Sequence, residues 1–272
     1  MRGVAWAGLA CLALASGSAP SRAQDASVRC GEEVPEADRQ GALASYRVGR
    51  DLVLAARWLE AEDPLTAAAR LDPLLPEPHY ALGQALMGLK RYPEAVEAFG
   101  RARDAFGCAT ASEPALRQAR RRADDEIREL REAIRKLEGD RLAQSRFPGR
   151  EANRESPLSL AESRLVIQQL EARLAELERW RKRGGGIPPE VLLALGSAHF
   201  NAGSLADAER EYRAALALDP GSGDAHNNLA VVLMLTARLD EAEREVRRAE
   251  QAGVPVNPRL EQEIARRRQP QR

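Results

Sequence analysis

The sequence predicts an all-α protein: a solenoid of stacked helical hairpins with one longer antiparallel hairpin inserted between them. The first observation is a period of 34 residues, seen most clearly between residues 189–222 and 223–256. A fixed period in this range is typical of helical repeat proteins. The second is a run between residues 113 and 183 in which apolar residues alternate spacings of four and three, as in paired long helices.

Residues 1–23 are expected to be a secretory signal peptide. Arg2 begins the chain with a positive charge, residues 3–15 are uncharged and mostly apolar, and Ser21-Arg22-Ala23 offers a cleavage site near Ala23. The apolar run is shorter than the ~20 residues that a membrane span needs. We therefore expect a periplasmic or secreted protein with no stable membrane span.

The charge balance argues against nucleic acid as a partner. The full chain has 41 basic and 41 acidic residues, and removal of residues 1–23 takes away only Arg2 and Arg22. A nucleic-acid-binding domain usually has an excess of basic residues on one face. The expected partner is therefore a protein or a peptide.

Each 34-residue unit is expected to be two amphipathic helices joined by a short turn. In the unit 189–222 the helices are predicted over residues 190–202 and 205–218, with the turn at Gly203-Ser204. Small residues fall where the helices approach each other. Because one such hairpin cannot bury its own apolar face, neighbouring units must stack.

This pattern resembles the tetratricopeptide repeat family. The residues that match in the unit 189–222 are Leu195, Gly196, Ala208, Tyr212, Ala215 and Pro220. The unit 223–256 repeats the pattern with Leu229, Ala230, Ala242, Val246 and Ala249, and the unit 76–109 with Leu82, Gly83, Ala95, Phe99 and Ala102. Residues 187–256 are therefore expected to form a C-terminal pair of repeats, and residues 257–272 a capping helix and tail.

A fourth unit, residues 42–75, completes an N-terminal pair within residues 24–109. Its matching residues are Val48, Gly49, Ala61, Leu65, Ala68 and Pro73. Pro64 falls where its second helix should run, and a proline inside a helix costs about 3 kcal/mol or more. We therefore expect a degenerate repeat in which Asp63 caps a shortened helix that begins at Pro64.

Residues 110–186 are expected to form a long coiled-coil hairpin. The first helix is predicted from Glu113 to about Ser145 and the second from about Leu158 to Arg183, with a break that begins at Phe147-Pro148-Gly149. The seams are Ala123, Ile127, Leu130, Ile134 and Leu137 on the first helix and Ser163, Ile167, Leu170, Leu174 and Leu177 on the second.

The sequence leaves the placement of this hairpin open. It could be an elongated middle repeat that projects from one continuous stack, which we favour because two repeats alone are marginally stable. Gly184-Gly185-Gly186 could instead be a hinge between two separate blocks. The seam could also pair between chains and produce a homo-oligomer.

Cysteine and histidine give few indications of chemistry. Cys30 and Cys108 remain after removal of the signal peptide, and in an oxidising compartment they form either a disulfide or two free thiols. His79, His199 and His226 occupy repeat positions that usually hold packing residues, and no spacing suits zinc. We expect no catalytic residues, no metal and no cofactor, and hence no enzyme.

The resemblance implies a groove, lined by the first helix of each repeat, that receives an extended peptide or a partner's helix. The residues at those positions are Tyr80, Gln84, Met87, Leu193, Ser197, Phe200, Asn227, Asn228, Val231 and Met234. The expected function is an exported adaptor or scaffold that binds protein in this groove. The alternative is a structural protein of the cell envelope that self-assembles through its coiled coil.

Overall fold

A computed structural model describes residues 30, 34–111, 113–146, 160–182 and 184–268; the expected signal peptide and the break at residues 147–149 lie outside them. The described residues form eleven α-helices and contain no strand. The helices are α1 (Glu36–Leu54), α2 (Trp58–Leu71), α3 (Pro76–Gly88), α4 (Tyr92–Thr110), α5 (Glu113–Arg146), α6 (Leu160–Lys182), α7 (Pro189–Asn201), α8 (Leu205–Leu218), α9 (Gly223–Leu235), α10 (Leu239–Gln251) and α11 (Pro258–Arg268).

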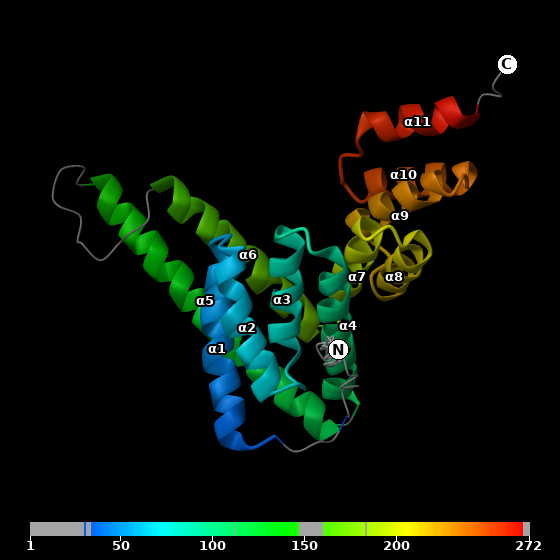
Figure 1. The fold of residues 1–272 in the computed structure, drawn as a ribbon. Coiled ribbons are helices and arrows are strands. Elements are labelled where there is room, and N and C mark those ends of the chain that lie inside the picture. The colour runs from blue at the N-terminus through cyan, green and yellow to red at the C-terminus, as the bar shows by residue number, and fades with distance from the viewer. Residues whose placement is uncertain (1–29, 31–33, 112, 147–159, 183, 269–272) are drawn as a thin grey trace, which may run out of the picture.

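Four helical hairpins form one continuous stack (Figure 1). The hairpins are α1 with α2, α3 with α4, α7 with α8, and α9 with α10. Between them α2 packs on α3, α8 packs on α9, and α7 packs directly on α4. Leu86 and Phe99 therefore share a buried cluster with Leu195, although a long insertion separates them in the sequence.

The long helices α5 and α6 pack against each other as a hairpin but do not form a layer of that stack (Figure 1). The interpretation of an elongated middle repeat is therefore wrong, because the next repeat docks on α4 without using the hairpin. The buried residues between the two helices include Ile127, Leu130, Ile167, Leu170 and Leu177, which the seam spacing had singled out. The hairpin thus has an apolar seam, against which Leu54 of α1 and Ala109 of α4 also pack.

A glycine in the first helix of three repeats accepts a large side chain from the second helix. A Cβ atom would lie 2.4 Å from Leu65 at Gly49, 2.6 Å from the Phe99 ring at Gly83, and 2.7 Å from the Tyr212 ring at Gly196. Real Cβ atoms essentially never come so close to other heavy atoms. These glycines set the distance between the two helices of a repeat.

Substitution of Gly83 by alanine tests this packing. Glycine to alanine inside a helix usually stabilises a protein by about 0.5–1 kcal/mol. At Gly83 the new methyl group must displace the Phe99 ring, so we expect a loss of about 1–3 kcal/mol in the free energy of unfolding. The matched control is Gly100→Ala in α4, where no atom lies within 4 Å of the added Cβ. Urea unfolding should show a lower free energy of unfolding for Gly83→Ala and a higher one for Gly100→Ala. A higher free energy of unfolding for both variants would contradict this packing.

The repeat that contains Pro64 is more regular than the sequence suggested. Helix α2 begins at Trp58 and continues through Pro64, so the prediction of a shortened helix that starts at Pro64 is wrong. Ala56, in the turn before α2, has a positive φ of 55°. The residues at the equivalent position of the other repeats, Lys90, Gly203 and Ala237, also have a positive φ. Ala61, Leu65 and Ala68 are fully buried, and this packing compensates for the hydrogen bond that proline removes.

The last helix covers the open end of the stack. Leu260 and Ile264 of α11 are buried against the final repeat, in the same cluster as Leu233 and Val246. The other side of α11 is charged and exposed. Such a terminal element gives a solenoid a polar outer surface.

Candidate functional site

The candidate site is the face formed by the first helices of the repeats, α1, α3, α7 and α9, which we call the inner face. On its N-terminal half the surface is not open, because the α5–α6 hairpin lies against α1 and α3. One cavity lies between Tyr46, Arg47 and Arg50 of α1 and the acidic side of α5. A second lies between α3, α4 and α7 on one side and both hairpin helices on the other.

Polar contacts connect α1 to the hairpin. Arg47 Nη2 donates to Glu129 Oε1 over 2.5 Å, and Arg50 Nη1 lies 4.0 Å from Oε2 of the same glutamate. The Tyr46 hydroxyl donates to Glu126 Oε1 at 3.4 Å, and Arg173 Nε of α6 donates to that oxygen at 3.1 Å. The repeat surface is thus basic where it meets carboxylates of α5.

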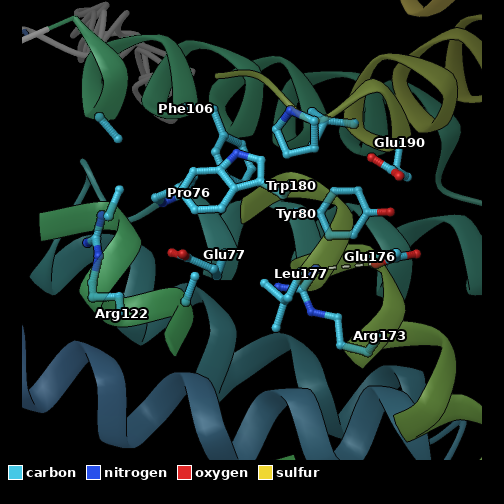
Figure 2. A pocket seen from close by; sticks show the side chains of 15 residues that line it. Pro76, Glu77, Tyr80, Phe106, Arg122, Arg173, Glu176, Leu177, Trp180 and Glu190 are labelled. Atoms are coloured by element: carbon cyan, nitrogen blue, oxygen red, sulfur yellow. Dashed lines mark hydrogen bonds and ion pairs between the residues drawn. The ribbon is translucent and has the colours of Figure 1, made fainter. Parts of the chain in front are cut away.

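The second cavity has a volume of about 30 Å³ and an aromatic lining that includes Tyr80 and Trp180 (Figure 2). Glu77 and Arg122 lie at one end of it, and Glu190 lies at the other. Within the described part of the chain, Glu77 Oε2 and Arg122 Nε are buried and have no hydrogen-bond partner. Burial raises the pKa of the Glu77 carboxyl above its ordinary value, because the charged form is poorly solvated there.

The expected groove residues on α3 are all partly buried. Tyr80 lines the cavity beneath the hairpin, and burial raises the pKa of its hydroxyl. Gln84 makes no contribution to either cavity lining, and Met87 packs beside the cluster of Leu86 and Phe99. The hairpin therefore covers the expected groove at Tyr80.

The expected groove residues on α7 and α9 line neither cavity beneath the hairpin. Leu193, Phe200 and Val231 are partly buried and pack at the edge of the last core cluster, while Met234 is a buried member of that cluster. Ser197 is used within the protein, since its hydroxyl donates to the Leu193 carbonyl at 2.9 Å and accepts from the Tyr212 hydroxyl at 3.2 Å.

Two partly exposed asparagines lie side by side on α9. Asn227 Nδ2 donates to Asn228 Oδ1 at 3.4 Å, which is a long and therefore weak hydrogen bond. A peptide backbone could replace this contact with stronger hydrogen bonds to both amides. The open part of the expected groove is thus Leu193, Phe200 and Val231 together with this asparagine pair.

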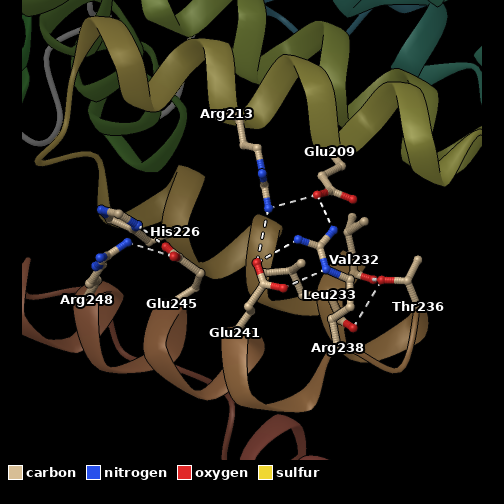
Figure 3. A network of polar contacts seen from close by, with 10 residues as sticks. All are labelled: Glu209, Arg213, His226, Val232, Leu233, Thr236, Arg238, Glu241, Glu245 and Arg248. Carbon is tan, nitrogen blue, oxygen red and sulfur yellow. Dashed lines mark hydrogen bonds and ion pairs between the residues drawn. The ribbon is translucent and has the colours of Figure 1, made fainter.

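Ion pairs that the sequence reasoning missed join successive repeats. Arg238 donates to Glu209 of the previous repeat at 2.5 Å and to Glu241 of its own at 2.6 Å (Figure 3). Arg91 makes the equivalent contacts with Glu62 and Glu94. Where α7 follows α4, the corresponding positions are Val96 and Ser204, so this pair is missing from the junction that bears the insertion. The recurrence of arginine at the repeat period was the signal available in the sequence.

The buried histidines serve the repeats themselves. His79 Nε2 lies 3.1 Å from the Pro73 carbonyl oxygen, and His226 Nε2 lies 3.0 Å from that of Pro220. His226 Nδ1 lies 2.6 Å from Glu245 Oε2 (Figure 3). Burial lowers the pKa of His79. Across the residues with a described placement, no group of three or more His, Cys, Asp or Glu side chains could hold a metal ion.

The structure also brings Cys30 and Cys108 together. The Sγ atoms of Cys30 and Cys108 are 1.93 Å apart and their Cα atoms 5.0 Å apart, across 78 residues of sequence. Cys108 lies near the end of α4, next to the start of the hairpin. None of the described helices is both long and apolar enough to cross a membrane.

Comparison with known proteins agrees with this architecture. Residues 46–107 and 193–258 match the family model described as tetratricopeptide repeat. Among solved structures the chain is similar to pilF of Pseudomonas aeruginosa, with 15% identity, coverage of 85% of this chain and 86% of that one, and a TM-score of 0.29. It is also similar to MamA MSR-1, with 16% identity, coverage of 78% and 96%, and a TM-score of 0.26.

A third similar structure comes from the hetero-tetramer Cut9-Hcn1, with 14% identity, coverage of 86% of this chain and 43% of that one, and a TM-score of 0.27. Similarities this weak support no further conclusion. No curated protein matches the sequence. Both matched segments coincide with the stacked hairpins and leave out the inserted one. Residues 46–107 and 193–258 therefore resemble tetratricopeptide repeats.

Proposed function

We propose that this chain is a protein-binding scaffold whose ligand surface is the inner face of α7 and α9. Tetratricopeptide repeats are generally protein interaction modules, and two segments of the chain match that family. The position of the hairpin supports this choice: it lies against α1, α3 and the first turn of α7, and its cavities include none of the expected groove residues on α7 and α9. Leu193, Phe200 and Val231 remain partly exposed beside the asparagine pair.

The chemistry of this surface suits an extended peptide or a short helix. Apolar side chains of the ligand would pack on Phe200 and Val231, while its backbone would hydrogen-bond to the amides of Asn227 and Asn228. Because apolar packing and backbone hydrogen bonds do not involve charge, the ligand does not need charged side chains. The role of the scaffold is to hold one partner in a defined place.

Export of the chain is part of the same proposal. The expected signal peptide in residues 1–23 would direct the protein to the periplasm or out of the cell. A disulfide between Cys30 and Cys108 would suit such an oxidising compartment. The alternative, self-assembly through the hairpin seam, has less support because Ile167 and Leu170 are already buried inside the chain.

The test is the double variant Asn227→Ala, Asn228→Ala, compared with wild type in cross-linking pull-downs from the native cell envelope. We expect capture of the specific partner to fall by about tenfold, which corresponds to about 1.4 kcal/mol of lost binding free energy. Gln251→Ala is the matched control, because it removes an exposed amide from α10, outside the inner face. Equal capture by all three proteins, with unchanged melting, would exclude this surface.

A further inference from the structure

We propose that the α5–α6 hairpin is an internal ligand of the inner face of α1 and α3, and that this face binds a partner's helix with an acidic side when the hairpin moves away. The proposal goes beyond the surface on α7 and α9, since it assigns a second, covered binding surface to the other half of the stack. It also gives a role to the inserted hairpin.

The charges across this contact are complementary. Arg47 and Arg50 of α1 face Glu129, and Tyr46 faces Glu126. Asp125 lines the same cavity, so three carboxylates of α5 lie towards α1. A partner helix that replaces α5 must present carboxylates at the same places, whereas a basic helix would be repelled by the two arginines.

The outer ion pair of this contact is weak. The Arg47 and Glu129 side chains are 51% and 38% exposed, and ion pairs with such exposure contribute little because water screens them. Glu77 Oε2 and Arg122 Nε are buried at the interface without a hydrogen bond in the described structure, which disfavours the closed state. The apolar core between α5 and α6 is well packed, so the hairpin would move as one unit.

A glycine hinge connects the hairpin to the C-terminal repeats. Gly184, Gly185 and Gly186 connect α6 to α7 with φ values of 88°, 96° and 96°, in the region that favours glycine. Arg120 Nη2 donates to the Gly184 carbonyl and Trp180 Nε1 to the Gly186 carbonyl, each at 2.6 Å. Two side chains of the hairpin thus hold the linker in its closed conformation.

Movement of the hairpin would leave the repeat stack intact. Helix α7 packs directly on α4, and Arg103 of α4 reaches Glu211 of α8 at 3.5 Å. Neither contact uses α5 or α6. The hairpin can therefore leave the inner face without separating the two pairs of repeats, and it lowers the apparent affinity of a competing helix for as long as it is bound.

A synthetic peptide of residues 116–137, labelled with a fluorophore, is the probe. Added to the full chain, it should bind about tenfold more tightly to the Glu129→Arg variant than to wild type, because the reversed charge repels Arg47 and Arg50 and releases the internal ligand. Glu132→Arg is the matched control: Glu132 is an exposed glutamate of α5 one turn after Glu129, and it does not line the cavity. This control should bind the peptide as wild type does.

Two further arms complete the test. The charge-swapped double variant Arg47→Glu, Glu129→Arg should restore the internal pair and return peptide binding to the wild-type level. A peptide with lysine at the places of Glu126 and Glu129 should not bind. If Glu129→Arg lowers the melting temperature strongly, Glu129→Ala provides a milder release with the same expected direction.

Equal peptide affinity for wild type and the Glu129 variants would overturn the proposal and make the hairpin a permanent part of the fold. Binding of the lysine peptide as tightly as the native one would overturn the acidic partner. The variants of this test lie on α1 and α5, so either negative result leaves the surface on α7 and α9 unaffected. A failure of the Asn227 and Asn228 test would likewise leave the hairpin proposal standing.

Discussion

Replacement of Tyr212 by alanine should lower the free energy of unfolding by about 3–5 kcal/mol, as expected when a large buried aromatic side chain is removed. Tyr212 is 2% exposed and fills the space above Gly196, which no side chain of the first helix can fill in its place. Its hydroxyl also donates to Ser197 Oγ. Urea unfolding followed by circular dichroism measures the loss.

Two variants make the test specific. Leu218→Ala in the same helix removes a side chain that is 48% exposed, and should cost no more than about 0.5 kcal/mol. Tyr212→Phe keeps the ring and loses only the hydroxyl, with an expected cost of about 1 kcal/mol. If Tyr212→Ala costs no more than Leu218→Ala, the ring does not stabilise the repeat in the way that the structure indicates.

The repeats could be predicted because each helical hairpin uses the same few positions for packing. Gly83 with Phe99 and Gly196 with Tyr212 are neighbours in space for the same reason that they match in sequence. Leu65 plays this part in the first repeat, where the proline obscured the pattern. The preference of proline for the first turn of a helix predicted a helix that begins at Pro64. The tertiary packing of Ala61, Leu65 and Ala68 outweighs that preference.

The position of the hairpin could not be predicted, because the seam describes only how α5 and α6 pair with each other. Their outer faces are charged, and charged faces are usually solvated. The contacts that place the hairpin on the repeats join Arg47 to Glu129 and Tyr46 to Glu126, about 80 residues apart, with no periodic signal between them. For the same reason the sequence could not show that the hairpin covers the expected groove at Tyr80.

Reduction of the Cys30–Cys108 disulfide should lower the free energy of unfolding by roughly 4 kcal/mol. The bond closes a loop of 78 residues, and the loss of chain entropy in the unfolded state grows with the logarithm of loop length. The loop contains α1, α2, α3 and most of α4, so reduction should loosen the whole N-terminal pair of repeats. Thermal melting of the mature chain with and without dithiothreitol measures the effect.

The double variant Cys30→Ser, Cys108→Ser is the control, since dithiothreitol should not change its melting temperature. The C-terminal pair lies outside the loop, and hydrogen exchange of α9 and α10 should therefore change less on reduction than that of α1 and α3. Two free thiols in the denatured mature protein, or equal melting of wild type in both redox states, would contradict the prediction. Because α1 supplies Tyr46, Arg47 and Arg50, loss of the disulfide should also weaken the contact that keeps the hairpin on the repeats.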